Sequence, residues 1–332
     1  MIWDHHAREA EFALHAVRAA AGLCRDVRRE AGKASLRKAD SSPVTVADYA
    51  SQALIAGWLA EQFPLDPLVA EEDSRTLEAE PGTLDQILEH LRRLRPEADA
   101  ARVRAWVDHG GGSVGDRFWA LDPIDGTKGF LRGDQYVVAL ALIEAGQAVV
   151  AALAAPSLGV DLLPRAAEDG CVVIAVRGTG SWVMPLDGGG ERRLGVSGCD
   201  APAAARLLCS VEDDHTDPDQ LARITRRLGM ETRPIRLDSQ VKYMVIAGGQ
   251  ADLSIRLLPK RQPSYKEKLW DVAAGLLVVE EAGGRVTDLA GRPLDLTTGR
   301  ELTRNHGSLI SNSLLHETAL AVIQSVLNEG AA

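Results

Sequence analysis

The stretch FWALDPIDGTKGFLRGDQ, residues 118–135, joins a run of apolar residues to two closely spaced aspartates, Asp122 and Asp125. The apolar residues predict a buried strand over 117–121, and the proline and glycine around the aspartates predict a sharp turn after it. Three interpretations are open: an exposed acidic turn, an aspartate nucleophile, or a metal site. An aspartate nucleophile has the signature D-x-D-G-T, with its acids two positions apart, whereas here they are three apart. The spacing therefore favours attack by a metal-assisted water over an aspartate nucleophile, and the acidic turn stays open.

The composition is that of an ordinary globular protein. The chain has 332 residues, of which 45% are hydrophobic and 25% charged, and its formal net charge is −10, so a large core is expected. The negative charge argues against nucleic-acid and anionic-membrane partners, because both bind basic surfaces. It leaves a small anionic ligand open, because bound divalent metals invert the local field around carboxylates.

The sequence is expected to belong to a cytoplasmic protein, and a monomer is compatible with it. No apolar run approaches the ~20 residues that span a bilayer, and the charged N-terminus is unlike a signal peptide. The four cysteines are scattered, without a C-x-x-C pair, and are expected to be reduced: Cys24, Cys171, Cys199 and Cys209.

Apolar patterning predicts an α/β protein. The elements expected in the N-terminal half are a helix over 5–30, a helix over 45–63, a strand over 67–70, a helix from 83 that ends before Pro96, a strand over 117–121, and two strands within 136–155. The continuous apolar character of the last pair indicates burial on both faces. A further hairpin is expected within 171–186, and then short strands alternate with helices, which indicates a layered structure. We place a boundary between an N-terminal half, 1–165, and a C-terminal half, 166–332.

Six acidic residues share a position relative to these elements. They are Glu71 and Glu72 at the end of the 67–70 strand, Asp122 and Asp125 after the 117–121 strand, Asp48 in the first turn of a helix, and Asp271 at the start of another. Strand ends and helix starts gather at one edge of an α/β sheet, where ligands usually bind. The carboxylates are therefore expected to converge, which disfavours the acidic turn.

Converging carboxylates repel one another, so a compensating cation is expected, and sites rich in oxygen suit Mg²⁺. Between the aspartates, the carbonyl of Ile124 could also face the metal, and the Thr127 hydroxyl could orient a water. The backbone N–H groups of Gly126 and Thr127 could hold phosphate oxygens. Two metal ions ~3.5–4 Å apart would activate a water and stabilise the leaving oxygen of a phosphate ester.

Three motifs resemble, in their order along the chain, the metal-binding motifs of the inositol monophosphatase superfamily of Mg²⁺-dependent, lithium-sensitive phosphatases. They are VAEED (69–73), LDPIDGT (121–127) and WDVAAGLLVVEEAGG (270–284). Further stretches resemble one branch, the 3′(2′),5′-bisphosphate nucleotidases: 41–52, 117–143, 237–257 and 264–271. Simple inositol monophosphatases usually carry Thr-Asn after D-G-T, where this chain has Lys128 and Gly129. The resemblance runs from the first helix nearly to the C-terminus.

The resemblance implies a layered αβαβα sandwich with an active site between its two halves. It implies that two or three Mg²⁺ ions are bound by Glu71, Asp122, Asp125, Asp271 and the carbonyl of Ile124. Asp48 and Thr127 would position and deprotonate the attacking water. Beside the backbone of Gly126 and Thr127, the substrate-binding residues that it implies are His215, Ser239, Lys242 and Arg256. The roles of Lys128, Arg132, Lys266 and Lys268 stay open between phosphate binding and neutralisation of nearby acids.

The activity implied is removal of the 3′-phosphate from adenosine 3′,5′-bisphosphate to give AMP, with the sulfated nucleotide as a further substrate. One alternative is a phosphatase of the same superfamily that acts on inositol (poly)phosphates or sugar phosphates. Another is a non-catalytic nucleotide sensor, which is disfavoured because every matching carboxylate is present.

Overall fold

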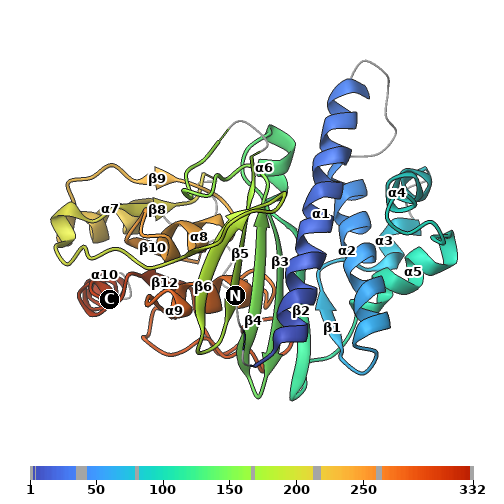
Figure 1. Ribbon diagram of the computed structural model, residues 1–332. Coiled ribbons are helices and arrows are strands. Elements are labelled where there is room, and N and C mark those ends of the chain that lie inside the picture. Colours follow the sequence, from blue (N-terminus) through green and yellow to red (C-terminus); the bar gives the residue numbers. More distant parts are fainter. Residues whose placement is uncertain are drawn as a thin grey trace.

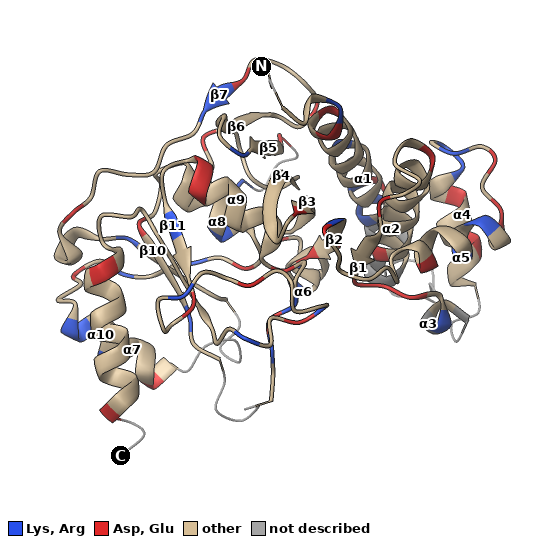
Figure 2. Ribbon diagram, turned by 90° about the horizontal axis from the view of Figure 1, so that it is seen from below, with Lys and Arg blue, Asp and Glu red and all other residues tan. Residues whose placement is uncertain are grey.

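Sheets and helices alternate in layers. The structure is a computed structural model that describes residues 3, 5–34, 43–78, 82–165, 169–211, 218–258 and 264–329. Two β-sheets are interleaved with three layers of helices (Figure 1), and the same succession is seen from below in Figure 2. The αβαβα sandwich implied by the resemblance is confirmed.

The first sheet has its strands in the same order in space as along the chain. Within the described residues they are β1 (Leu68–Ala70), β2 (Arg117–Asp125), β3 (Val137–Glu144), β4 (Gln147–Ala155), β5 (Cys171–Val176), β6 (Gly180–Pro185) and β7 (Arg192–Arg193). Neighbouring strands are antiparallel except β1 and β2, which are parallel. The predicted boundary at residue 165 falls inside this sheet, because β4 pairs with β5 across it. The division into two halves stays a prediction.

Helices cover both faces of the first sheet. On one face lie α1 (Ala7–Ala34) and α2 (Pro43–Gln62), and on the other lie α8 (Val241–Ala247) and α9 (Ala273–Glu281). The smaller helices α3 (Ser74–Glu78), α4 (Thr83–Leu91) and α5 (Ala100–His109) lie beyond α2 (Figure 1). Helix α6 (Thr127–Arg132) follows β2 directly.

The side chains of β3 show how this sheet is buried. Val138 and Leu140 belong to the apolar core under α1 and α2, whereas Val137 and Ala139 belong to the core that contains α8 and α9. Successive residues of a strand point to opposite faces, so a strand between two helix layers needs apolar residues at every position. This confirms the burial on both faces that the sequence predicts.

The second sheet lies beyond α8 and α9 and has the strand order β11-β12-β10-β8-β9. Its strands are β8 (Leu207–Cys209), β9 (Ile235–Arg236), β10 (Leu253–Arg256), β11 (Arg285–Thr287) and β12 (Ser308–Ser311), and η1 (Pro202–Ala204) precedes them. Its outer face is covered by α7 (Pro218–Arg227) and α10 (His316–Glu329), which share a third apolar core with it. The sheet is mixed: β8 is parallel to β9 and β10, and β12 is antiparallel to β10 and β11.

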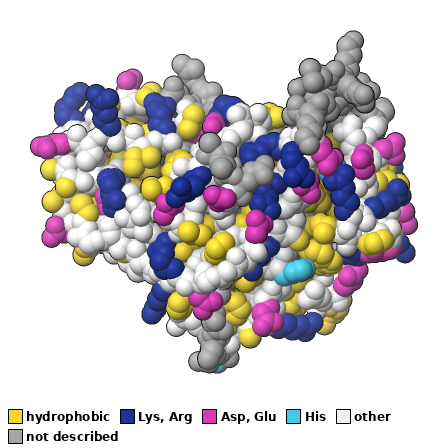
Figure 3. Space-filling view, turned by 45° about the horizontal axis from the view of Figure 1, so that its top comes forward, with side chains coloured by type: hydrophobic (Ala, Val, Ile, Leu, Met, Phe, Trp, Pro, Cys, Tyr) yellow, Lys and Arg dark blue, Asp and Glu magenta, His cyan; other side chains and the backbone are white. Residues whose placement is uncertain are grey.

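One face of the molecule carries charges of both signs. On the face shown in Figure 3, acidic and basic side chains lie interspersed among apolar ones. Within the described residues, no helix combines the length and apolar character that a bilayer-spanning segment requires. All four cysteines are free, and Cys24 and Cys171 are buried.

Candidate active site

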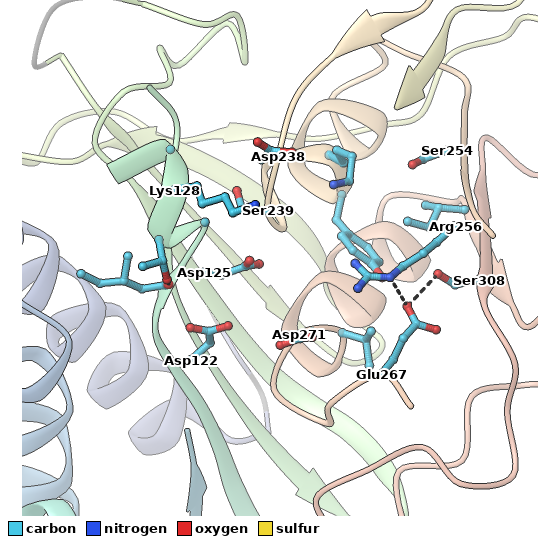
Figure 4. Close-up of a pocket in the computed structure, with 18 of the residues that line it drawn as sticks. Asp122, Asp125, Lys128, Asp238, Ser239, Ser254, Arg256, Glu267, Asp271 and Ser308 are labelled. Carbon is cyan, nitrogen blue, oxygen red and sulfur yellow. Dashed lines mark hydrogen bonds and ion pairs between the residues drawn. The ribbon is translucent and has the colours of Figure 1, made fainter. Parts of the chain in front are cut away.

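One pocket of about 300 Å³ gathers most of the predicted site residues. It is lined by Glu71, Asp122, Ile124, Asp125, Gly126, Thr127, Ser239, Lys242, Arg256 and Asp271, together with residues that the sequence did not single out. Figure 4 shows the carboxylates of Asp122 and Asp125 pointing into the space between β2 and the elements that carry Arg256 and Asp271. Two predicted residues do not line it: Asp48 lies outside the lining, and His215 lies outside the described residues.

The two aspartates of the first motif lie on a β-bulge. Strand β2 continues through the predicted turn to Asp125, and its pairing with β3 shifts on the way: Asp122 pairs with Ala139, and Asp125 with Val137. One extra residue therefore lies on β2 between the aspartates. Residues three apart on a regular strand point to opposite faces, but the extra residue brings both carboxylates to the pocket. The prediction of a strand that ends at residue 121 was wrong, because a bulge can hold a proline that a regular ladder excludes.

The carboxylates act on one another electrostatically. The pKa of Glu71, which follows β1, is raised to about 8 by burial and then by the charges of Glu72, Asp271 and Asp125. The pKa of Asp271 is raised to about 7 by burial and then by the charge of Asp125. Burial, followed by the charges of Asp125 and Glu71, also raises the pKa of Asp122. These four carboxylates line the same pocket, and their closeness accounts for the mutual effects on the pKa values.

Two helix starts differ from the sequence prediction. Helix α2 begins at Pro43, so Asp48 lies in its second turn, and α9 begins at Ala273, so Asp271 precedes the helix. The helix dipole acts mainly on the first turn and therefore does not account for Asp48. Asp48 is only 4% exposed, and burial and the charges of the two glutamates after β1 raise its pKa. Asp48 therefore lies near these two glutamates without lining the pocket.

The turn after the bulge packs directly against the segment that leads into α8. Thr127 Oγ1 donates a long hydrogen bond of 3.4 Å to the carbonyl of Ile124. Between them, Gly126 has a φ of 96°, which glycine adopts without the cost of a Cβ. A Cβ at this position would lie 3.1 Å from the Cβ of Ser239. The motif and the pocket's opposite wall are therefore in contact.

Gly129 allows the chain to turn back after α6. A Cβ added to Gly129 would overlap the carbonyl oxygen of Gln135, and the Gly129 carbonyl accepts a hydrogen bond from Asp134 N at 2.8 Å. Gly129→Ala is expected to lower the free energy of unfolding by about 1–3 kcal/mol, because overpacking against backbone forces a shift. Denaturant unfolding measures this, with Gly115→Ala as the control, since a Cβ at Gly115 meets open space. Equal free energies of unfolding for the two variants would contradict the inference that a side chain at residue 129 is excluded by the Gln135 carbonyl.

Cationic side chains lie on the pocket wall opposite the aspartates. Lys242 lies in the first turn of α8, and its pKa is lowered by burial and then by the charge of Arg256. Arg256 ends β10, where its Nε lies 3.2 Å from Glu267 Oε1 and its Nη2 donates to the Tyr265 hydroxyl at 3.1 Å. Two cations that line the same pocket favour an anionic ligand between them and the aspartates.

Several pocket residues were missed by the sequence prediction, and Glu267 is the most informative. It is 3% exposed and lies between Arg256 and Ser308, whose hydroxyl donates to it at 3.3 Å (Figure 4). Tyr243 and Ser254 also line the pocket. The sequence shows an acid, Glu267, in the stretch SYKEK, but the polar residues around it give no indication that it is buried.

Arg300 was missed as well. Its guanidinium donates to the carbonyls of Ala70, Glu71 and Gly110, the last two at 3.4 Å. It also lies 4.6 Å from the centroid of the Trp270 ring. Arg300 therefore ties the end of β1 to the residue next to Asp271. No local pattern signals this role, because the partners are distant in the sequence.

The structure separates the basic residues whose roles were open. Lys128 lines the pocket. Arg132 pairs with Asp134 at 2.8 Å and Asp238 at 3.0 Å, and Lys268 pairs with Glu301 at 2.6 Å. Arg132 and Lys268 are therefore engaged with acids of the protein.

The residues of the pocket fit a divalent cation. Asp122 Oδ1 is buried and has no hydrogen-bond partner among the described residues, although buried polar atoms normally have one. Carboxylate and carbonyl oxygens that crowd one pocket are the donors that Mg²⁺ prefers. Within the described residues, no three acidic, histidine or cysteine side chains already form a group able to hold a metal.

Comparisons with known proteins identify relatives over nearly the whole chain. The profile of the "Inositol monophosphatase family" matches residues 6–327. A 3′(2′),5′-bisphosphate nucleotidase of Oryza sativa is 37% identical over 98% of this chain and 96% of its own length. A 3′(2′),5′-bisphosphate nucleotidase 2 of Candida albicans is 36% identical over 96% of this chain and 97% of its own length.

Solved structures show the same fold. SuhB of Mycobacterium tuberculosis has a TM-score of 0.64 at 21% identity, with 98% of each chain covered. CysQ of Bacteroides thetaiotaomicron, described as a bacterial member of the inositol monophosphatase family, has a TM-score of 0.63 at 22% identity, covering 92% of this chain and 98% of its own. From the family profile, the full-length relatives and the fold together, the chain belongs to the inositol monophosphatase family.

Proposed function

We propose that the protein hydrolyses the 3′-phosphate of adenosine 3′,5′-bisphosphate to AMP and phosphate, and that it also accepts the sulfated nucleotide. The observation that carries this proposal is a pocket with Asp122 and Asp125 on one wall and Lys242 and Arg256 on the other. In a bisphosphorylated ligand, one phosphate can react beside the aspartates while the other is bound by Lys242 and Arg256. Relatives named 3′(2′),5′-bisphosphate nucleotidase, similar over nearly the full length, support the choice of substrate.

In this proposal the pocket holds two or three Mg²⁺ ions. Their ligands are Glu71, Asp122, Asp125, Asp271 and the carbonyl of Ile124. When bound, the ions supply activation of a water and charge stabilisation at the leaving oxygen. Arg300 donates to the carbonyls of Ala70 and Glu71. It therefore fixes the backbone that carries the proposed ligand Glu71.

The protein's own groups position the substrate and move the proton. The Thr127 hydroxyl orients the attacking water, takes one of its protons and passes its own to the carboxylate of Asp48. The N–H groups of Gly126 and Thr127 bind oxygens of the reacting phosphate. Lys242 and Arg256 bind the second phosphate, with Ser239 beside them. Glu267 and Tyr265 fix the guanidinium of Arg256, which limits the entropy lost on binding.

The proposed halves contribute differently to this chemistry. Residues 1–165 supply every proposed metal ligand except Asp271, and residues 166–332 supply that aspartate together with Lys242 and Arg256. We propose that the reaction takes place where the two halves meet. His215 is proposed as a further nucleotide contact on the resemblance alone, because it lies outside the described residues.

A substrate panel tests the proposal. With Mg²⁺ present, kcat/KM for phosphate release from adenosine 3′,5′-bisphosphate is expected to exceed that from inositol 1-phosphate, inositol 1,4-bisphosphate and fructose 1,6-bisphosphate by roughly 100-fold. Inositol 1-phosphate lacks a second phosphate, and losing one charge-assisted contact costs ~1.5–3 kcal/mol, or about 10- to 100-fold. The other two bisphosphates place their second phosphate differently relative to the first, so we expect them to lose the same contact with Lys242 and Arg256. Phosphate assay and chromatography of the nucleotide product measure the outcome, and AMP must accumulate without further hydrolysis.

The panel contains its own controls. A chelator should remove activity on every substrate, because the proposed metal ligands then lack their cations. If phosphate is released faster from an inositol phosphate or from fructose 1,6-bisphosphate than from adenosine 3′,5′-bisphosphate, the nucleotide is not the preferred substrate and the proposal is wrong. Release that persists in the chelator would contradict the metal assignment.

A further inference from the structure

Gln240 lies between the two walls of the pocket. It is 1% exposed and directly precedes α8. Its backbone N–H donates to Asp125 Oδ2 at 2.7 Å, a short bond of the charge-assisted kind. One of the two oxygens of that carboxylate is therefore held by a backbone group 115 positions away in the chain.

The side chain of Gln240 reaches the other carboxylate-bearing segment. Its Nε2 donates to the carbonyl of Trp270 at 3.0 Å, and its Oε1 accepts from the N–H of Gly275 at 3.0 Å. These two backbone groups flank Asp271 on either side in the sequence. A single residue thus binds Asp125 through its backbone and brackets Asp271 through its side chain.

The backbone before Gln240 is strained and firmly held. Ser239 has a φ of 62°, which is unusual for a residue other than glycine and costs on the order of 1–3 kcal/mol. On its far side, Asp238 accepts hydrogen bonds from Ser210 Oγ at 2.6 Å and Val211 N at 2.9 Å. Anchors on both sides keep this conformation, and strain maintained in this way is found where a functional geometry must be held.

We infer that Gln240 is a positioning residue that sets the separation of the Asp125 and Asp271 carboxylates. The inference rests on the proposed function, in which both carboxylates bind Mg²⁺. Like charges repel, so their separation must be held by a rigid connection. A neutral amide with both its donor and its acceptor satisfied provides that connection without adding a charge to the site.

The test replaces the amide by an apolar side chain of similar length. Gln240→Met removes both side-chain hydrogen bonds and leaves the charge of the site unchanged. Mg²⁺ is titrated into the protein, and the rise in Tm is followed without substrate, while kcat and KM are measured separately. We expect the Mg²⁺ concentration at half-maximal stabilisation to rise by roughly 10- to 100-fold, as for other residues that orient metal ligands. Raising Mg²⁺ should restore part of kcat, with KM for the nucleotide changed by less than about threefold, because Gln240 acts through the metal ligands.

Asn312 offers a matched control. This buried amide also ties backbone segments together: Nδ2 donates to the carbonyl of Cys199 at 2.7 Å, and Oδ1 accepts from Leu315 N at 3.2 Å, outside the pocket. Asn312→Leu should lower the metal-free Tm as Gln240→Met does, but leave the Mg²⁺ midpoint unchanged. Equal midpoints for wild type and Gln240→Met, or equal shifts in both variants, overturn the inference.

Two further measurements keep the outcomes distinct. If Gln240→Met does not fold, Gln240→Asn is used instead, because its amide is one methylene too short to reach both Trp270 and Gly275; a wild-type midpoint in that variant also overturns the inference. A wild-type protein that neither releases phosphate nor gains stability from Mg²⁺ contradicts the proposed function instead.

Discussion

Asp122→Asn is expected to lower kcat by roughly 100-fold or more, because it removes a charge and a donor oxygen from the metal-binding wall. The fold should persist. Burial and the neighbouring carboxylates already raise the pKa of Asp122, so replacing its charge by a neutral amide of the same shape relieves repulsion. Steady-state phosphate release measures the loss, and thermal unfolding without Mg²⁺ verifies the fold.

Asp116→Asn is the matched control for this variant. Asp116 is exposed, directly precedes β2 and lies at the opposite end of that strand from the bulge. The same chemical change should leave kcat within about twofold of wild type, as for surface substitutions in general. Substantial turnover by Asp122→Asn, or a comparable loss in Asp116→Asn, would remove Asp122 from the proposed metal ligands.

Lys242→Met is expected to reduce kcat/KM for adenosine 3′,5′-bisphosphate by about 10- to 100-fold, because a charge-assisted hydrogen bond to a phosphate contributes ~1.5–3 kcal/mol. The loss should be much smaller for adenosine 3′-monophosphate, which has no second phosphate to bind. Most of the effect should lie in KM, since the contact is made in the ground state and in the transition state alike. Steady-state kinetics on both nucleotides measures the difference.

Lys268→Met serves as the control for lost positive charge. Lys268 pairs with Glu301 and is not among the residues that line the pocket, so both nucleotides should keep kcat/KM within about twofold of wild type, as is usual for a surface ion pair. If Lys242→Met lowers kcat/KM equally for the two nucleotides, then Lys242 binds the reacting phosphate or stabilises the fold, and does not bind the second phosphate.

Local patterning was sufficient where each residue's environment follows from its neighbours in the chain. The apolar run at 136–155 predicted two buried strands, and β3 and β4 lie there with both faces covered. The Ala-rich segment near the N-terminus predicted a helix, and α1 spans it. In both cases the local composition and apolar patterning of the segment decide the element.

Patterning failed where tertiary pairing decides the backbone. The proline after Asp122 predicted a turn, but β2 continues because β3 pairs with it across a one-residue bulge. Helix α9 starts two residues after Asp271, because the segment before it is held in place by Gln240 and Arg300. The anchors responsible lie far from the segments they hold, so no local window contains them.

The sequence by itself determined the chemistry available to this protein. Three acidic motifs in one order, with three-residue spacing in D-P-I-D, predicted the donor atoms of a magnesium site and the family. Only the tertiary structure decided how those donors face one another. The bulge sets which side of β2 Asp122 and Asp125 occupy, while Gln240 reaches Asp125 across 115 positions and Arg300 reaches Ala70 across 230. The sequence gives the identity of each donor directly. The separation of like charges depends on the distant groups that hold them, and only the folded chain brings those groups together.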